Sequence, residues 1–199
     1  EDAVATAAVR ARLAAVGVGP EADIIVMHVG AGNEFRRWPE TSFAEVGTGL
    51  VSDRPNRRII LTTGLAQAPA AEAARAAMLS LGVPARSVHV MCDLDLASLR
   101  SLVGLSRLFV GGDSGPAHVA ATTDVPMVVV YGPTTPAIWG PWRPPHLVTE
   151  FVQVDVGCRP CDQRRCEPGD YRCLTWSRPA DVLAAAERAW SRAATAGAS

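Results

Sequence analysis

Short runs that are apolar at nearly every position constrain the fold of this chain most. The runs IIVMHV (residues 24–29) and MVVVY (residues 127–131) lack the polar–apolar alternation of a strand with one solvated face. Such runs indicate strands that helices cover on both faces, as in parallel sheets. Ala-rich stretches with helical periodicity separate them. This alternation predicts an α/β fold with a doubly wound parallel sheet of about six strands.

The expected elements follow one another along the whole chain, and the organisation favours a single domain. We expect strands at residues 24–29, 58–63, 87–91, 107–111, 127–131 and 147–154, and helices between them at 41–52, 68–81, 96–105 and 116–123. The expected layout is a lead-in helix (1–20), a Rossmann-like core (21–156), a Cys-rich loop (157–176) and a C-terminal helix (177–199).

The charge and hydropathy of the chain argue against nucleic-acid binding and against a membrane span. The net charge of −1 gives no global field that would attract nucleic acid or an anionic membrane. The apolar runs are shorter than the roughly 18 residues of a membrane span. The chain starts without Met and without the basic and apolar regions of a signal peptide. We therefore expect a piece of a longer cytoplasmic protein that does not bind nucleic acid.

The run GDSGP (residues 112–116) also surrounds the nucleophile of many serine proteases. Those proteases are all-β proteins, whereas this run lies between an expected strand and an expected helix. The nucleophile elbow of α/β-hydrolases does occupy that place, but its G-x-S-x-G pattern fails here at Pro116. We therefore predict that Ser114 is not a nucleophile.

The same loop is suited to binding an anion. In doubly wound sheets ligands bind at the carboxyl ends of the strands, where this loop is expected. At the start of the next helix the backbone N–H groups of Ser114 and Gly115 can donate to a phosphate. Asp113 would hold a hydroxyl group or fix the loop. His118 could donate to a phosphate, or could be a core histidine bonded to a backbone carbonyl.

Two further loops with small and polar residues follow expected strands. After the first strand, Gly30 and Gly32 allow close approach of backbone, Asn33 offers an amide, and Arg36 offers a guanidinium that can bind two phosphate oxygens. After the fifth strand, Thr134 offers a hydroxyl group. The three loops together predict a site of the size of a diphosphate.

Four of the five cysteines lie close together in the sequence, at Cys158, Cys161, Cys166 and Cys173. Four thiolates could hold a structural Zn or Fe ion in tetrahedral geometry. The alternatives are small, partly buried thiols or disulfides formed after purification. Because the cysteines do not spread through the chain as a disulfide framework, a reduced protein is expected.

Three segments resemble one family in sequence and in order. HVGAGNEFRRWPETSFAEV (28–46), VGGDSGPAHVAA with DVPMVVVYGPTTPAIWGP (110–141), and CRPCDQRRCEPGDYRC (158–173) are similar to the lipopolysaccharide heptosyltransferases, glycosyltransferase family nine. The resemblance covers nearly the whole chain. It implies the C-terminal, donor-binding half of a two-domain GT-B glycosyltransferase, which inverts the anomeric centre and needs no metal for transfer.

The resemblance also implies roles for individual residues. Asp113, Ser114 and Gly115 would hold the diphosphate or the ribose, with His118 beside them, and Arg36 would neutralise the leaving phosphate. The base of the nucleotide would lie near Met91, where backbone groups would form hydrogen bonds with it.

The function implied is transfer of heptose from ADP-heptose to a lipopolysaccharide core or another glycan acceptor. The chain by itself would be inactive, because the acceptor surface belongs to the N-terminal domain. The full-length protein would be cytoplasmic, at the inner face of the bacterial inner membrane if it associates peripherally. The alternatives are a nucleotide-sugar epimerase of the same fold and a non-catalytic nucleotide-binding or assembly module.

Overall fold

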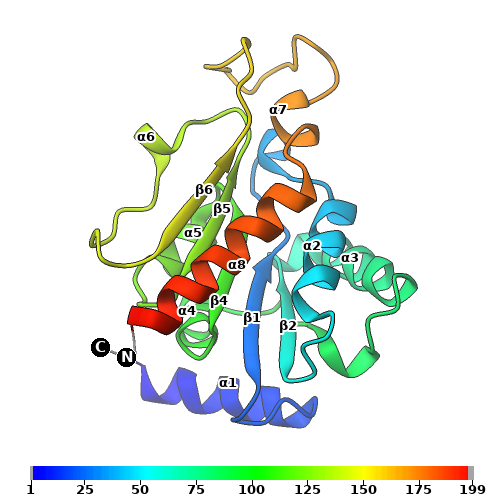
Figure 1. Ribbon diagram of the computed structural model, residues 1–199, viewed down its shortest axis with the longest axis vertical. Helices are drawn as coiled ribbons and strands as arrows, with labels where there is room; N and C mark the ends of the chain where they lie inside the picture. The colour runs from blue at the N-terminus through cyan, green and yellow to red at the C-terminus, as the bar shows by residue number, and fades with distance from the viewer. Residues whose placement is uncertain (1, 197–199) are drawn as a thin grey trace.

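Six parallel strands form the centre of the fold, as the apolar runs predict (Figure 1). The computed structural model describes residues 2–196, so the ends of the expected helices 1–20 and 177–199 fall partly outside the described residues. The strands are β1 (Asp23–His28), β2 (Arg57–Thr62), β3 (Val88–Val90), β4 (Leu108–Gly112), β5 (Met127–Tyr131) and β6 (Thr149–Gln153). The strand β6 is shorter than expected, because residues 144–147 form a turn in which the Leu147 N–H donates to the Pro144 carbonyl.

The strand order is β3-β2-β1-β4-β5-β6, and every neighbouring pair is parallel. The chain leaves β1 toward β2 on one side and returns to β4 on the other. In sheets of this kind the reversal of strand order opens a crevice at the carboxyl ends of the two central strands. Here that position lies between β1 and β4, where His28 is in register with Gly111.

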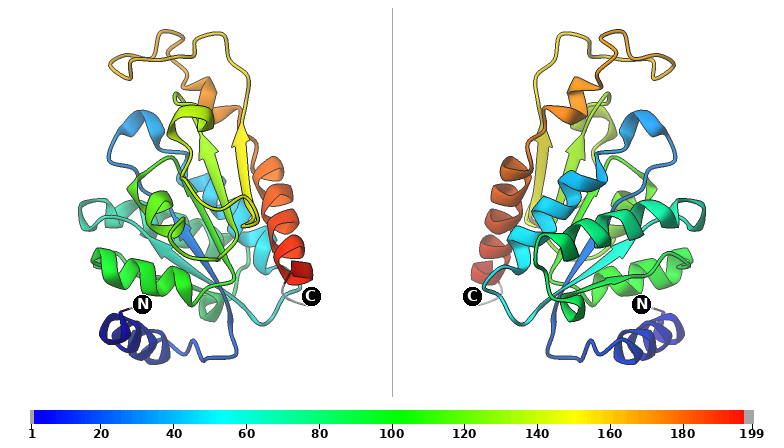
Figure 2. Two further views of the ribbon diagram at one scale, coloured as in Figure 1. Left: turned by 90° about the vertical axis from the view of Figure 1, so that its left-hand side faces the viewer. Right: turned by 90° about the vertical axis from the view of Figure 1, so that its right-hand side faces the viewer.

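Helices cover both faces of the sheet and bury a separate apolar cluster on each (Figure 2). One face carries α2 (Glu40–Val51), α3 (Ala68–Ser80) and α8 (Pro179–Ala196). The other carries α1 (Ala3–Ala15), α4 (Leu96–Gly104) and α5 (Gly115–Ala120). The fold is therefore the doubly wound α/β arrangement expected.

Short helical turns in the loops escaped the sequence analysis. They are α6 (Pro136–Trp139), α7 (Arg172–Thr175) and the 3₁₀ turns η1 (Glu34–Arg36), η2 (Leu65–Gln67) and η3 (Ala85–Ser87). Segments of three or four residues show no periodicity that a sequence pattern could reveal.

Helix α8 is held to the sheet by an apolar stripe and by one buried arginine. Val182, Ala185, Ala186 and Ala189 recur with helical spacing and are fully buried. The buried Arg57 guanidinium donates to the Leu50 carbonyl and to Glu187 Oε1 at 2.8 and 2.7 Å, and it lies 4.1 Å from the Trp190 ring. Figure 1 shows that α8 runs across β5 and β4, and Figure 2 shows that α8 and α1 lie on opposite sides of the sheet. None of the helices between residues 2 and 196 has the length and hydropathy needed to cross a membrane.

Candidate functional site

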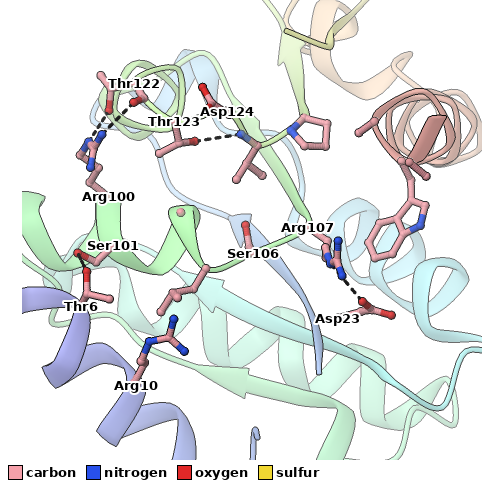
Figure 3. A pocket seen from close by; sticks show the side chains of 17 residues that line it. Thr6, Arg10, Asp23, Arg100, Ser101, Ser106, Arg107, Thr122, Thr123 and Asp124 are labelled. Atoms are coloured by element: carbon pink, nitrogen blue, oxygen red, sulfur yellow. Dashed lines mark hydrogen bonds and ion pairs between the residues drawn. The ribbon is translucent and has the colours of Figure 1, made fainter. Parts of the chain in front are cut away.

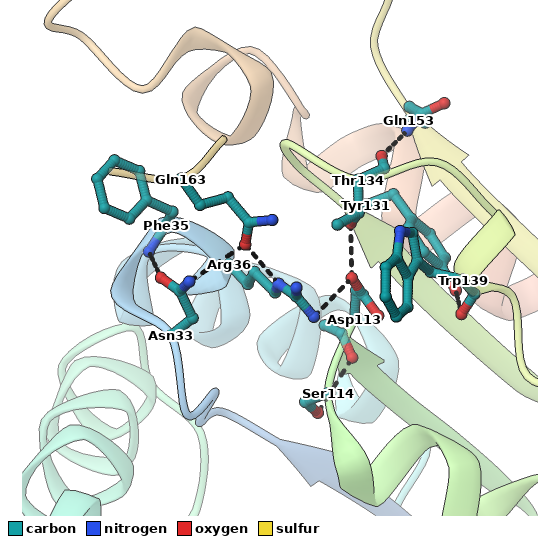
Figure 4. A network of polar contacts seen from close by, with 11 residues as sticks. Asn33, Phe35, Arg36, Asp113, Ser114, Tyr131, Thr134, Trp139, Gln153 and Gln163 are labelled. Carbon is teal, nitrogen blue, oxygen red and sulfur yellow. Dashed lines mark hydrogen bonds and ion pairs between the residues drawn. The ribbon is translucent and has the colours of Figure 1, made fainter. Parts of the chain in front are cut away.

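The loops that follow β1, β4 and β5 meet at the carboxyl ends of the strands (Figure 4). Asp113, directly after β4, accepts a hydrogen bond of 2.5 Å from the Thr134 hydroxyl, which follows β5. The same carboxylate oxygen lies 3.3 Å from Nη1 of Arg36, at the end of η1. Three of the expected site residues, each from a different loop, are thus in direct contact.

Asp113 is the centre of this network. Its side chain is only 3% exposed, and its backbone N–H donates to the Val130 carbonyl, as the strand ladder would require. A buried carboxylate needs a charged or hydrogen-bonded partner, and Arg36 and Thr134 supply both. Asp113 therefore joins the loop after β4 to the loops after β1 and β5.

A glycine at the end of β4 allows the loops to approach. A Cβ atom on Gly112 would lie 3.2 Å from the backbone oxygen of Arg36, which is tighter than ordinary packing. With glycine here, the loop after β1 can cross the end of β4 closely enough for Arg36 to reach Asp113.

One face of the Arg36 guanidinium is covered by an aromatic ring. The guanidinium carbon lies 5.8 Å from the centre of the Trp139 ring, within the range of a cation–π contact. The hydroxyl group of Tyr131 donates to the Trp139 carbonyl at 3.1 Å and anchors α6 there. Burial, and to a smaller extent the Asp113 charge, raises the pKa of Tyr131, so this phenol stays protonated as a donor.

A residue that the sequence analysis missed joins this network from the Cys-rich loop. Gln163 Oε1 accepts from Nε of Arg36 at 2.7 Å and from Nδ2 of Asn33 at 3.2 Å (Figure 4). Asn33 also caps η1, because its Oδ1 accepts from the Phe35 N–H. The expected Asn33 amide is therefore at the site, where its nitrogen and its oxygen both form hydrogen bonds with other residues of the protein.

The other expected glycines and polar residues surround the network without joining it. Gly32 and Gly115 are exposed, and the Ser114 hydroxyl donates to the Gly112 carbonyl at 3.2 Å. Gly30 is buried, and a Cβ atom there would overlap Oε1 of Gln67. His118 is exposed on α5 and its ring makes no hydrogen bond within residues 2–196, so it is not a core histidine.

Met91 directly follows β3 and is buried. Its side chain is buried in the cluster on the α1–α4–α5 face, and its N–H donates to the Leu61 carbonyl at 2.9 Å. Recognition of the nucleotide's base by backbone groups near Met91 stays a prediction.

The four clustered cysteines lie around one cavity of about 290 Å³, but not as a metal site. Throughout the described chain, no group of three or more His, Cys, Asp or Glu side chains is placed to hold a metal ion. Cys161 and Cys166 accept backbone hydrogen bonds, and all four cysteines are free. Burial, followed by the charge of Cys158, raises the pKa of Cys173. The structure does not support the Zn or Fe interpretation for Cys158, Cys161, Cys166 and Cys173.

His28, the last residue of β1, is a second position that the sequence analysis did not single out. Its Nδ1 lies 3.0 Å from the Thr62 hydroxyl at the end of β2, and its ring is buried beneath the Gly30 loop. Burial lowers the pKa of His28 to about 4. Its ring therefore stays neutral at pH 7 and forms part of the floor of the site.

His28 predicts a loss of stability in mild acid. In the unfolded chain its pKa is 6.5, so acid protonates the unfolded state first and favours it between pH 6.5 and 4. From pH 7 to pH 5 this histidine should lower the free energy of unfolding by about 2 kcal/mol. Urea unfolding at several pH values should show that His28→Gln loses this part of the pH dependence, while His146→Gln, on an exposed loop, keeps it. Equal pH dependence in wild type and His28→Gln would contradict the prediction.

A larger cavity, of about 770 Å³, lies at the opposite end of the sheet (Figure 3). Its polar side chains largely bond to one another: Thr6 donates to Ser101 at 3.2 Å, and Arg100 donates to Thr122 at 3.0 Å. Ligands of doubly wound sheets bind at the carboxyl ends of the strands, whereas this cavity adjoins the amino ends of β4 and β5. The candidate site is therefore the Arg36–Asp113–Thr134 network.

Comparison with known proteins finds similarity to a glycosyltransferase family. The family described as glycosyltransferase family 9 (heptosyltransferase) matches residues 4–172. Lipopolysaccharide heptosyltransferase 1 of Pseudomonas aeruginosa is 29% identical over 149 residues, which are 74% of this chain and 38% of that protein. Lipooligosaccharide heptosyltransferase 2 of Campylobacter jejuni is 31% identical over 81 residues, which are 41% of this chain and 25% of that protein.

The solved structure of E. coli ADP-heptose lipopolysaccharide heptosyltransferase II has the same fold. It matches with a TM-score of 0.77 at 19% identity, over 96% of this chain and 53% of that one. The chain thus spans about half of the solved relative and less of the curated ones. Because the family match extends from α1 to α7, the chain belongs to glycosyltransferase family 9, the heptosyltransferase family.

Proposed function

We propose that this chain is the donor-binding domain of an inverting glycosyltransferase that transfers heptose from ADP-heptose to a lipopolysaccharide core acceptor. The observation that carries the proposal is the meeting of Arg36, Asp113 and Thr134 where the strand order reverses, the usual ligand position in this fold. The names of two relatives, an ADP-heptose lipopolysaccharide heptosyltransferase and a lipopolysaccharide heptosyltransferase, support the nucleotide, the sugar and the acceptor.

In such a transfer, an acceptor hydroxyl oxygen bonds to the anomeric carbon of heptose while the bond from that carbon to the β-phosphate oxygen breaks. The electron pair of the broken bond stays on ADP, so negative charge grows on the diphosphate. A positively charged group placed at that diphosphate stabilises the transition state more than the bound substrate.

The residues at the site suit this task in different ways. Arg36 would neutralise the departing phosphate, since its Nη2 donates to no residue in the described part of the chain. The exposed ring of His118 and the backbone of Ser114 and Gly115 would contribute further hydrogen bonds. Asp113 and Thr134 would hold the loops, because the Thr134 hydroxyl donates to Oδ2 of Asp113.

The general base that accepts the proton of the acceptor hydroxyl is proposed to come from the acceptor-binding half of the enzyme.

That this chain alone transfers no sugar stays a prediction. So does a cytoplasmic location with peripheral contact to the inner membrane, where a lipopolysaccharide acceptor would be met. Membership of a glycosyltransferase family favours transfer over the two alternatives, epimerisation and nucleotide binding without catalysis.

Calorimetric titration with ADP tests the proposed site through His118. A hydrogen bond to a charged phosphate contributes about 1.5–3 kcal/mol, so His118→Ala should bind ADP about ten- to a hundredfold more weakly than wild type. His146→Ala, which removes an exposed histidine from the loop before β6, is the matched control and should bind as wild type does. Failure of the wild-type chain to bind ADP would overturn the proposed function. Equal affinities in both variants would remove His118 from the site.

A further inference from the structure

Gln163 belongs to the irregular Cys-rich loop, 127 residues away from Arg36 in sequence, yet its side chain ends at the candidate donor site. Its carbonyl oxygen Oε1 accepts from Nε of Arg36 at 2.7 Å and from Nδ2 of Asn33 at 3.2 Å. Figure 4 shows the amide reaching across from the loop to the guanidinium. The contact joins a segment with no regular structure to the residue that the proposed function places on the leaving phosphate.

The chemistry of its partners determines which end of the Gln163 amide faces the site. Arginine can only donate, so the Gln163 atom opposite Nε of Arg36 must be the oxygen. The orientation of Asn33 is determined independently, because its own oxygen accepts from the Phe35 N–H and its nitrogen is left to donate. Gln163 is thus a double acceptor with both bonds accounted for.

The backbone at Gln163 adopts a conformation that glutamine rarely takes. Its φ is +58°, in the left-handed region that favours glycine and asparagine. Its N–H donates to Sγ of Cys161 at 3.4 Å, so a cysteine of the cluster supports the turn. Strained backbone of this kind persists only where its surroundings determine it, and it gathers at functional sites.

A second contact ties the same loop to the loop after β5. The Arg159 guanidinium donates to the Gly132 carbonyl through Nε at 3.1 Å and through Nη2 at 2.6 Å. The Cys-rich loop therefore rests on two of the three loops that form the site, which restricts its freedom to move away from Arg36.

Arg36 is consequently held on three sides. Gln163 occupies Nε, the Asp113 carboxylate pairs with Nη1, and the Trp139 ring covers one face of the guanidinium. Within residues 2–196, Nη2 is the nitrogen of this guanidinium without a partner. Because the guanidinium is planar and rigid, holding Nε and Nη1 also determines the direction in which Nη2 points.

We infer that Gln163 is a positioning residue, which orients the Arg36 guanidinium so that Nη2 meets the terminal phosphate of the donor nucleotide. The inference rests on the proposed function and deepens it, since it assigns the Cys-rich loop to the donor site. The role belongs to the side-chain oxygen of Gln163, and it acts through Arg36 alone.

Titration of the 199-residue chain with ADP and with AMP tests this role. Gln163→Ala should weaken ADP binding about three- to tenfold, because Arg36 loses one of its orienting hydrogen bonds. AMP lacks the phosphate that Arg36 would meet, so its affinity should stay within about twofold of wild type. Gln163→Gly, which relieves the positive φ, should show the same ADP loss. Arg164→Ala, in the same loop and exposed, should bind both nucleotides as wild type does.

A double-mutant cycle with Arg36→Ala separates positioning from general support of the loop. If Gln163 acts through Arg36, Gln163→Ala should change ADP affinity by less than about twofold in the Arg36→Ala background. Additive losses, or equal losses for ADP and AMP, would overturn the inference. Normal ADP binding by Gln163→Ala, together with weak binding by Arg36→Ala, would also overturn the inference. In that case the proposed function would still stand. A wild-type chain that binds no ADP would overturn both.

Discussion

Arg36→Ala is expected to bind ADP about ten to a hundred times more weakly than the wild-type chain, because a charge-assisted hydrogen bond to phosphate contributes about 1.5–3 kcal/mol. The Arg36 side chain is three-quarters buried and points into the site from the end of η1. From the loop after β1, Arg36 contacts Asp113 of the loop after β4 and Trp139 of the loop after β5. Calorimetric titration with ADP measures the loss directly.

Arg37→Ala is the matched control for this variant. Arg37 is the next residue, carries the same charge and is exposed, and its Nε donates to the Ala31 carbonyl of its own loop. If the effect at Arg36 comes from a directed contact, Arg37→Ala should stay within about threefold of wild type, equivalent to under 1 kcal/mol. Equal losses in the two variants would mean that only net charge matters, and Arg36 would lose its proposed role.

Trp38→Ala should cost about 3–5 kcal/mol of folding stability, the usual range for truncating a large aromatic side chain in a core. Trp38 is 1% exposed and packs edge to face on Phe43, with ring centres 4.9 Å apart. Its Nε1 donates to the Ser177 carbonyl at 3.1 Å, and this bond joins the loop after β1 to the segment before α8. Urea unfolding at pH 7 should show a lower midpoint.

Two other tryptophan variants determine where that loss comes from. Trp142 is 88% exposed, so Trp142→Ala should change stability by no more than about 0.5 kcal/mol. Trp38→Phe keeps most of the ring and loses the hydrogen bond to Ser177, which should cost on the order of 1 kcal/mol for the bond itself. A Trp38→Ala variant as stable as wild type would contradict the packing described here.

The sequence by itself determined the fold class and the places of the main elements. The strand expected at 127–131 is β5 as found, and the one expected at 24–29 differs from β1 by one residue at each end. Both are buried on two faces, and that burial is what their unbroken apolar runs encode. The glycines and polar residues after β1, β4 and β5 were also readable, because parallel strands bring their carboxyl ends to one edge.

The tertiary structure alone decided which of those residues touch. Asp113 and Thr134 are 21 residues apart, and Asp113 meets Arg36 only because β4 lies beside β1 in the sheet. Strand order is set by packing of the whole domain, and no local pattern contains it. Gln163 shows the same limit, since nothing in its neighbourhood in the sequence indicates Arg36 as its partner.

The cysteine cluster shows the difference between closeness in sequence and geometry in space. The short spacings bring Cys158, Cys161, Cys166 and Cys173 to one cavity, as a metal site would require. Ligation also needs thiolates that converge on one point, and this depends on the path of the loop. That path is determined by contacts with distant residues, through Gln163 to Arg36 and through Arg159 to Gly132, which only the folded chain brings together.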